Sequence, residues 1–550
     1  MMSLKPSLNQ PIPDFTDRIA RSAFPRNENV YLRMRDVFGT IHADEQFADL
    51  YPQRGQPAES PWRLALITVM QYAENLTDRQ AADAVRARID WKYALGLELD
   101  DPGFDFSVLS KFRKRLVAGG TEQQLFERML EALRAADLLK SGGKQRSDST
   151  HVLGAIRTLN RLELVGEALR QVLEAVAAVV PAWLQERVTP EWFERYGQPL
   201  DSYRLPKDEK EKEQLALSIG ADGVHLLTSI YSDPDHGWLA VIPAVETMRQ
   251  IWVQQYVHQD EVLRWRTNKE TPPATVRIVS PFDFEARQAK KRDTRWLGYK
   301  VHLTETCDLD QPKLITHVET RIACQQDFLA TEDIHQALDE KQLLPEQHIV
   351  DTAYVSGAHL VASEDNYGVD LLGPVLPDSS WQARQADAYD LTQFQIHWEQ
   401  KMAVCPQGHM SKRWDPRTDR HNKPVVSIHF SLKSCRRCPV KALCTTSTKQ
   451  GRHLTVRPQA EHEAIQARRQ YQATEAFREA YAVRAGVEGV ISQAAYTLGM
   501  RRARYRGLAK THLQNVATAT AINLRRAVAW LLGKPTATTR ITRFAALAPG

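Results

Sequence analysis

The chain has 550 residues, of which 43% are hydrophobic and 25% are charged. This is an ordinary globular composition, and at about 150 residues per domain it predicts several domains. No run of about 18 apolar residues is present and the N-terminus lacks the apolar stretch of a signal peptide, so we expect a cytosolic protein without a membrane-spanning helix. The net charge of +5 is by itself only weak evidence for a nucleic-acid partner.

Residues 1–140 are predicted to form a helical DNA-binding region. Thr77 is the expected N-cap of one helix and Ser107 the expected N-cap of the next. The second helix carries four basic side chains and no acidic one: Lys111, Arg113, Lys114 and Arg115. Such a cluster attracts DNA phosphates, and short helices with a basic face are typical of helix-turn-helix modules. A plain helical bundle with a solvated basic face is the alternative.

Residues 141–377 alternate strands with helices, which predicts the first part of an α/β core. Residues of about 156–280 return to helical periodicity and predict a helical insertion. Asp148 lies within one strand, and Asp351 ends another that is otherwise apolar. A buried carboxylate is costly unless it is paired or binds a metal. Taken singly, each acid is more often a capping or ion-paired residue.

Residues 378–455 are polar and predict an inserted β-rich subdomain. Four of the six cysteines gather there, at Cys405, Cys435, Cys438 and Cys444. A cytosolic protein keeps its thiols reduced, so this cluster predicts a structural Zn²⁺ site rather than disulfides. His409 is a substitute ligand, and unliganded surface thiols are the alternative.

Residues 456–533 are predicted to be the final, helical part of the core. Tyr481, Arg484 and Glu488 are spaced three and four apart, which places them on one face of a helix. A carboxylate for metal beside an arginine for phosphate suits phosphodiester cleavage, whereas an ordinary Arg–Glu helix pair is the alternative. A second basic cluster contains Arg501 and Arg502. Residues 534–550 are predicted to be a flexible tail.

The spacing of Tyr481, Arg484 and Glu488 resembles the signature of DDE transposases of bacterial insertion sequences, in the broad group that includes the Tn-five-type enzymes. The segments RSDSTHV around Asp148 and IVDTAYVSG around Asp351 are also similar to these enzymes, as are residues 280–308 and about 60–120. One departure is that the signature continues with a lysine where this chain has Ala495. The nearby basic residues that could supply that phosphate contact are Arg501, Arg502 and Lys510.

This resemblance implies a mixed α/β protein with an RNase H-like catalytic core, an N-terminal helical DNA-binding region, a helical insertion and a cysteine-bearing insertion. It also implies that Asp148, Asp351 and Glu488 bind Mg²⁺ or Mn²⁺, and that Tyr481 and Arg484 contact DNA. Two such ions can activate an attacking oxygen and stabilise a leaving oxygen.

The implied function is that of a transposase. It would bind the terminal inverted repeats of an insertion sequence, cut the double-stranded DNA and join the ends to target DNA. The resemblance further implies a homodimer on paired ends, associated with the nucleoid. Two other functions stay open: a hydrolytic nuclease without strand transfer, and a non-catalytic DNA-binding protein derived from a transposase.

Overall fold

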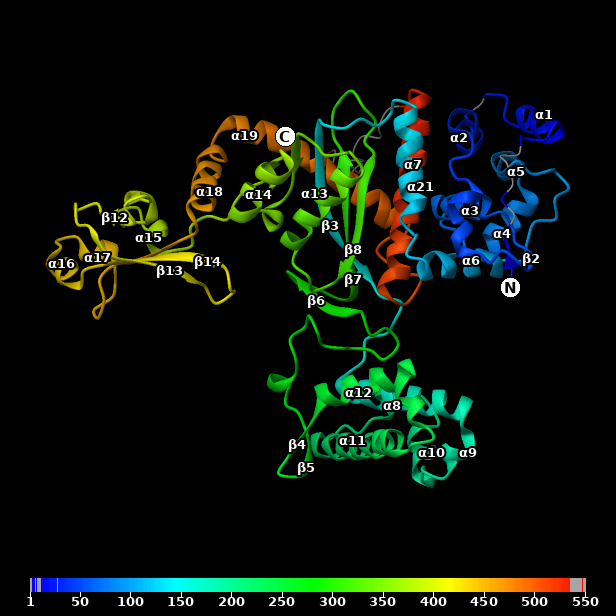
Figure 1. Ribbon diagram of the computed structural model, residues 1–550, viewed down its shortest axis with the longest axis horizontal. Helices are drawn as coiled ribbons and strands as arrows, with labels where there is room; N and C mark the ends of the chain where they lie inside the picture. Colours follow the sequence, from blue (N-terminus) through cyan, green and yellow to red (C-terminus); the bar gives the residue numbers. More distant parts are fainter. Residues whose placement is uncertain (1, 5, 7–10, 27, 535–546, 548–550) are drawn as a thin grey trace.

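The computed structural model describes residues 2–4, 6, 11–26, 28–534 and 547. A central sheet carries three projecting parts: the N-terminal helices on one side, residues 378–455 on the other, and a helical lobe between them (Figure 1). The tail predicted for residues 534–550 lies outside the described residues, apart from Lys534 and Leu547. No helix in the described ranges is both long and apolar enough to cross a bilayer.

The central sheet has six strands, and it confirms the predicted mixed α/β class. Its strand order is β10-β9-β3-β7-β6, with β8 also paired to β7. β3 is antiparallel to β7, and β7 is antiparallel to β6 and β8, whereas β9 and β10 run parallel to β3. The bounds are β3 (Lys144–Leu153), β6 (Arg287–Lys291), β7 (Thr294–Thr306), β8 (Ile315–Ile322), β9 (Gln347–Ile349) and β10 (Asp370–Leu372).

Helices cover both faces of this sheet, which is why β7 is buried along most of its length. On one face, the Ser147 hydroxyl bonds to His348, whose other ring nitrogen bonds to His335 of α13. On the opposite face, Glu305 accepts a hydrogen bond from Arg526 of α21. The helices concerned are α13 (Ala330–Glu340), α14 (Gly357–Tyr367), α18 (Gln459–Tyr471), α19 (Glu475–Ala482), α20 (Val487–Ser492) and α21 (Leu508–Leu531).

Helix α21 also closes the exposed edge of the sheet. The Asn523 side chain accepts a hydrogen bond from the Ile315 N–H at 2.7 Å and donates one to the Ile315 carbonyl at 2.8 Å. Asn515 donates to the Thr320 hydroxyl further along β8. Unpaired edge groups would otherwise invite strand addition, so these buried amides protect the edge while they fix α21 in register with the sheet.

The N-terminal helices share one continuous hydrophobic core with the sheet and α21. Thr77 is confirmed as an N-cap, since its hydroxyl accepts from the Gln80 N–H. The N-cap prediction for Ser107 is wrong: Ser107 is the first helical residue, and its N–H bonds to the Asp105 carboxylate. The elements are β1 (Met2–Ser3), α1 (Asp14–Ala23), α2 (Val30–Phe38), β2 (Gln56–Pro57), α3 (Pro61–Ala73), α4 (Asp78–Ala87), α5 (Ile89–Leu95), α6 (Ser107–Ala118) and α7 (Gln124–Ala135).

The helical lobe has a hydrophobic core of its own, running from Leu162 to Ile278. Asn160 caps its first helix by accepting from the N–H groups of Leu162 and Glu163. Its elements are α8 (Arg161–Val179), α9 (Pro181–Gln185), α10 (Pro190–Tyr196), α11 (Glu209–Ser232), α12 (Pro243–Gln255), β4 (Tyr256–Gln259) and β5 (Val262–Trp265).

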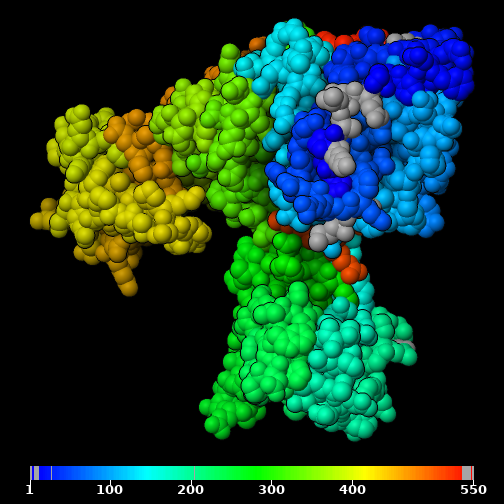
Figure 2. Space-filling view, turned by 45° about the vertical axis from the view of Figure 1, so that its right-hand side comes forward, coloured from blue at the N-terminus to red at the C-terminus, as the bar shows by residue number. Residues whose placement is uncertain are grey.

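Residues 378–455 form a separate small lobe around a third core. It is built on the three-stranded sheet β13-β14-β15 and a two-stranded hairpin. Figure 2 shows this lobe standing clear of the helical lobe, with an open hollow between them. Its elements are α15 (Trp381–Arg384), β11 (Gln395–His397), β12 (Met402–Val404), β13 (Ser411–Thr418), β14 (Pro424–Phe430), α16 (Leu432–Arg437), α17 (Lys441–Cys444) and β15 (His453–Val456).

Candidate functional site

Three alternate residues on one face of β3 bind the C-terminal part of the chain. Successive side chains of a strand point to opposite faces, so Arg146, Asp148 and Thr150 share a face. Arg146 donates to the Val483 carbonyl at 2.5 Å, Asp148 accepts from Arg484 at 2.9 Å, and Thr150 accepts from Arg501 at 2.9 Å. The strand therefore holds residues 483–501 against its carboxylate.

Asp148 and Asp351 both approach the same nitrogen of the Arg484 guanidinium. Its Nη2 atom is 2.9 Å from Oδ2 of Asp148 and 3.7 Å from Oδ2 of Asp351. Asp351 follows β9, the strand parallel to β3, and its Oδ1 accepts from the Ala353 N–H at 2.8 Å. Two carboxylates from neighbouring strands thus converge on one positive charge.

Burial and charge act against each other at Asp148. Burial raises the pKa of this carboxyl, and the negative charge of Asp351 adds to the rise. Arg484, the Ser149 N–H and Lys291 lower it. The pKa of Asp148 is raised overall, so burial outweighs the opposing effect of Arg484.

Glu488 lies on α20, the helix that packs against β3. Its side chain is exposed and makes no hydrogen bond or ion pair with any described residue. The expected single helical face is wrong in detail, because the segment is divided into α19, a 3₁₀ turn at Val483–Gly486 and α20. Gly486 lies in that turn, and a Cβ atom there would collide with the Arg146 guanidinium.

A divalent cation fits the two aspartates, which present carboxylate oxygens to one cationic atom. Oxygen donors of this kind suit Mg²⁺, which keeps several waters and needs few protein ligands. In the part of the chain that the structure describes, no three His, Cys, Asp or Glu side chains are placed to hold a metal ion. The geometry accordingly brings Asp148 and Asp351 together but leaves Glu488 outside the pair.

A buried charged cluster lies beside Asp148 on the same face of the sheet, and no pattern in the sequence indicated it. Glu305 of β7 is almost completely buried and accepts from Arg146 at 2.8 and 2.6 Å and from Arg526 at 2.6 Å. Its position opposite Arg146 in the β3–β7 pairing puts both on the face that carries Asp148. Arg146 thereby joins the sheet to the turn before α20, and Glu305 joins the sheet to α21.

A basic cavity of about 820 Å³ opens beside the aspartates. Ala353, two residues after Asp351, lies in its wall, together with Phe328 and the Lys300–Asp327 ion pair, whose atoms are 2.6 Å apart. The other charged lining residues are Arg277, Lys290, Lys291 and Arg295. The run KKRDTR at the β6–β7 turn is the sequence pattern that could have indicated this surface. The sequence alone does not show that the run lies beside the aspartates, and the fold does.

The basic residues predicted on α6 separate into two kinds. Lys111 and Lys114 are exposed, whereas Arg113 is buried, paired with Asp78 and stacked over the Tyr505 ring. The prediction that Arg113 contacts DNA is therefore corrected, because its guanidinium is used inside the fold. Arg115 is half-buried over the Tyr51 ring, 4.5 Å from the centroid.

The basic residues of the second cluster also differ from one another. Arg501 points to the carboxylate-bearing face of β3 and donates to the Tyr496 hydroxyl at 3.2 Å. Arg502 is exposed, and its backbone forms an isolated bridge with Leu153 at the end of β3. Ala495 lies in a π-helical turn, Gln493–Thr497. Arg501 thus contacts Tyr496, the residue that follows Ala495.

The four clustered cysteines line one small cavity of about 30 Å³, together with His409. They come from the turn after β12, from α16 and its end, and from α17. The Cys435 sulfur accepts from the Arg452 N–H at 3.4 Å. The four thiols thus line one cavity. Among the described residues, however, their positions do not meet the geometry of a metal-binding group.

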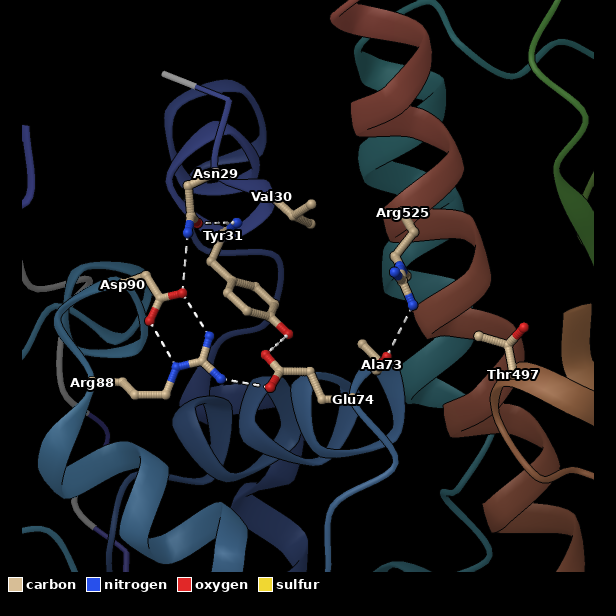
Figure 3. A pocket seen from close by; sticks show the side chains of 9 residues that line it. All are labelled: Asn29, Val30, Tyr31, Ala73, Glu74, Arg88, Asp90, Thr497 and Arg525. Carbon is tan, nitrogen blue, oxygen red and sulfur yellow. Dashed lines mark hydrogen bonds and ion pairs between the residues drawn. The ribbon is translucent and has the colours of Figure 1, made fainter. Parts of the chain in front are cut away.

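A different pocket, of about 430 Å³, lies between α2, α3 and α21 (Figure 3). Its two carboxylates are already occupied: Glu74 accepts from Tyr31 and Arg88, and Asp90 accepts from Arg88 and Asn29. Arg525 of α21 donates to the Ala73 carbonyl across the opening. The bond from Arg525 joins the N-terminal helices to α21. Because the polar groups of the pocket already bind one another, we assign this pocket a structural role and not a catalytic one.

Two stretches of the chain match known families. Residues 404–528 match a family described as Transposase DDE domain, and residues 19–115 match one described as Transposase domain (DUF772). No curated protein and no solved structure matches the chain significantly. The two matches support a DDE-type transposase of an insertion sequence.

Proposed function

We propose that this chain, two stretches of which match transposase domains, cuts DNA at the terminal repeats of an insertion sequence and joins the freed ends to target DNA. The observation that carries the proposal is the convergence of Asp148 and Asp351 on one nitrogen of Arg484. The strand order supports an RNase H-like core, because β3, β7 and β8 are antiparallel neighbours and β9 and β10 follow later in the chain, parallel to β3 and on its other side; β6 is an additional strand that pairs with β7.

Asp148 and Asp351 are the residues that would hold divalent metal ions, with Glu488 as the third ligand. Such ions lower the pKa of a bound water and stabilise charge on the leaving oxygen of a phosphodiester. Arg484 and Arg501 lie on the same face of β3 and would bind phosphate oxygens, for which the guanidinium fork is well shaped. The aspartates are fixed by β3 and the end of β9, and Tyr481 lies within electrostatic reach of both.

Cleavage of DNA that carries the repeats flanking the gene is expected to require Mg²⁺ or Mn²⁺, and the cut ends should be joined to a second DNA. Metal ions stabilise charge that develops only as the bond breaks, so omitting them should stop cleavage and leave binding in place. Gel shift and product analysis on the same DNA measure the two steps. Cleavage without joining would indicate a hydrolytic nuclease, and binding without cleavage in any metal would indicate a non-catalytic DNA-binding protein.

We further propose that the protein acts as a homodimer on paired DNA ends.

We also propose that Cys405, Cys435, Cys438 and Cys444 bind a structural Zn²⁺. Four thiolates that line one cavity suit tetrahedral coordination once their protons are lost. Purified protein is expected to contain about one zinc ion per chain, and Cys435→Ser with Cys438→Ser should remove it and lower the melting temperature. Cys307→Ala with Cys324→Ala, outside the cluster, is the matched control. The zinc site would be refuted if the unmodified protein contained no zinc and the double cysteine variant had the same melting temperature as the unmodified protein.

A further inference from the structure

We infer that the hairpin formed by β13 and β14 is a second DNA-binding surface, which grips the phosphate backbone of duplex DNA next to the paired aspartates. The inference rests on the proposed function and extends it, since it assigns DNA contacts to a lobe outside the aspartate site and the N-terminal helices. Three basic side chains near the tip carry it: Arg417, Arg420 and Lys423.

The charge of this lobe is out of proportion to that of the chain. Residues 411–452 contain eleven Lys and Arg against two Asp and Glu, whereas the whole chain has a net charge of only +5. Both acids are already paired, Asp415 with Arg413 at 3.0 Å and Asp419 with Arg457 at 3.1 Å. A concentrated positive field on a small, otherwise polar lobe attracts a polyanion through counterion release.

The tip of the hairpin is a built structure. Asp419 Oδ1 accepts from the N–H groups of His421 and Lys423 at 2.8 and 3.0 Å, and Asn422 adopts a positive φ of 60°. Arg417, Arg420 and Lys423 are exposed, and none is ion-paired with an acid in the described residues. The hairpin thus holds three unpaired cations on a fixed turn, which lowers the entropic cost of binding.

The hairpin faces the catalytic region. In Figure 1 the β13–β14 turn points back toward the central sheet. Lys423 Nζ lies over the Phe328 ring, 4.8 Å from its centroid, and Phe328 lines the basic cavity beside the aspartates. The cavity that Lys291 and Arg295 line and the cation at the hairpin tip therefore meet at Phe328.

Duplex DNA is the partner that this surface fits best. A two-stranded β-ribbon is one of the elements that DNA grooves admit, and the duplex carries the evenly spaced charge that a row of cations requires. Among the described residues of the hairpin tip, the His421 imidazole is the one exposed ring, and Trp414 of β13 is half-buried against Trp398, so the tip offers no row of aromatic side chains on which successive single-stranded bases could stack. The contacts are accordingly to phosphates and independent of base sequence.

The test uses the full chain and a short duplex of arbitrary sequence. Arg417→Gln, Arg420→Gln and Lys423→Gln together should weaken binding and reduce the slope of log K against log salt by about 3, or about 1 for each lost phosphate contact. The matched control removes the same charge from the helical lobe, with Lys207→Gln, Lys210→Gln and Lys269→Gln, all exposed. That control should leave the slope unchanged.

Hydrogen exchange on the unmodified chain supplies a second measurement that does not depend on a variant folding correctly. The amides of residues 417–425 should become protected when duplex is added and not when the protein concentration is raised. Protection by protein alone would identify a protein interface instead and overturn the inference. So would an unchanged salt slope in the hairpin variant, provided that the unmodified chain binds. If the unmodified chain binds no DNA, the proposed function itself fails.

Discussion

Glu488→Ala is expected to abolish DNA cleavage while binding to the same DNA is retained. If Glu488 completes the metal site with Asp148 and Asp351, its loss acts on the chemical step, and the rate should fall on the order of 10³-fold, or about 4 kcal/mol of transition-state stabilisation. The fold should be unaffected, because the side chain is exposed and makes no hydrogen bond or ion pair among the described residues. Single-turnover cleavage and gel shift on repeat DNA measure both quantities.

The matched control for this substitution is Glu479→Ala, an exposed glutamate on the preceding helix α19. It removes the same charge from the same surface and should cut at the normal rate. If Glu488→Ala also cuts normally, Glu488 is not the third ligand, and the resemblance of Tyr481, Arg484 and Glu488 to the transposase signature is accidental. If both variants are inactive, charge on this surface matters more than coordination.

Glu305→Gln is expected to cost the largest amount of stability. The side chain is about 1% exposed and neutralises Arg146 and Arg526, of which Arg146 is itself buried. A glutamine cannot neutralise the two arginines. Removing one partner of a buried ion pair lowers the free energy of unfolding by about 3–5 kcal/mol, because it leaves an uncompensated charge in a low dielectric. Denaturant unfolding followed by circular dichroism measures the loss.

The control for this prediction is Glu475→Gln in the exposed Arg478–Glu475 pair of α19. Exposed ion pairs contribute about 0–1 kcal/mol, so this variant should unfold almost as the unmodified chain does. The double variant Arg146→Met with Glu305→Leu should recover part of the lost stability, because it removes both charges of the buried pair. Arg526 is then the one member of the cluster that keeps its charge and loses its partner. Equal effects of the two glutamine substitutions would mean that water reaches Glu305.

The parts of the site that depend on local patterns could be predicted from the sequence. Asp148 lies in β3, within the predicted strand, and Asp351 lies just after β9, as the apolar run before it indicated. The Thr77 cap is likewise a local signal, because its partner Gln80 is three residues away. The mixed α/β class followed from the alternation of strands and helices.

What could not be predicted depends on contacts between distant parts of the chain. Arg113 stands in a basic helix by sequence, and only the packing of Asp78 and Tyr505 around it shows that it is buried. Arg146 meets Glu305 across 159 positions and Val483 across 337. The break in the helix before Glu488 follows from the same contact, since Gly486 leaves the space that the Arg146 guanidinium fills.

The position of α21 has a consequence for protein synthesis. This helix, residues 508–531, fills the core between the N-terminal helices and the sheet, and Arg484 and Arg501 also come late in the chain. Domains fold as they leave the ribosome, N-terminal parts first. Here the sheet that carries both aspartates has emerged long before its edge is covered and its arginines are in place. Residues up to about position 531 must therefore be synthesised before the edge of the sheet is covered. A translation product that ends before Arg484 would contain both aspartates without the guanidinium on which they converge.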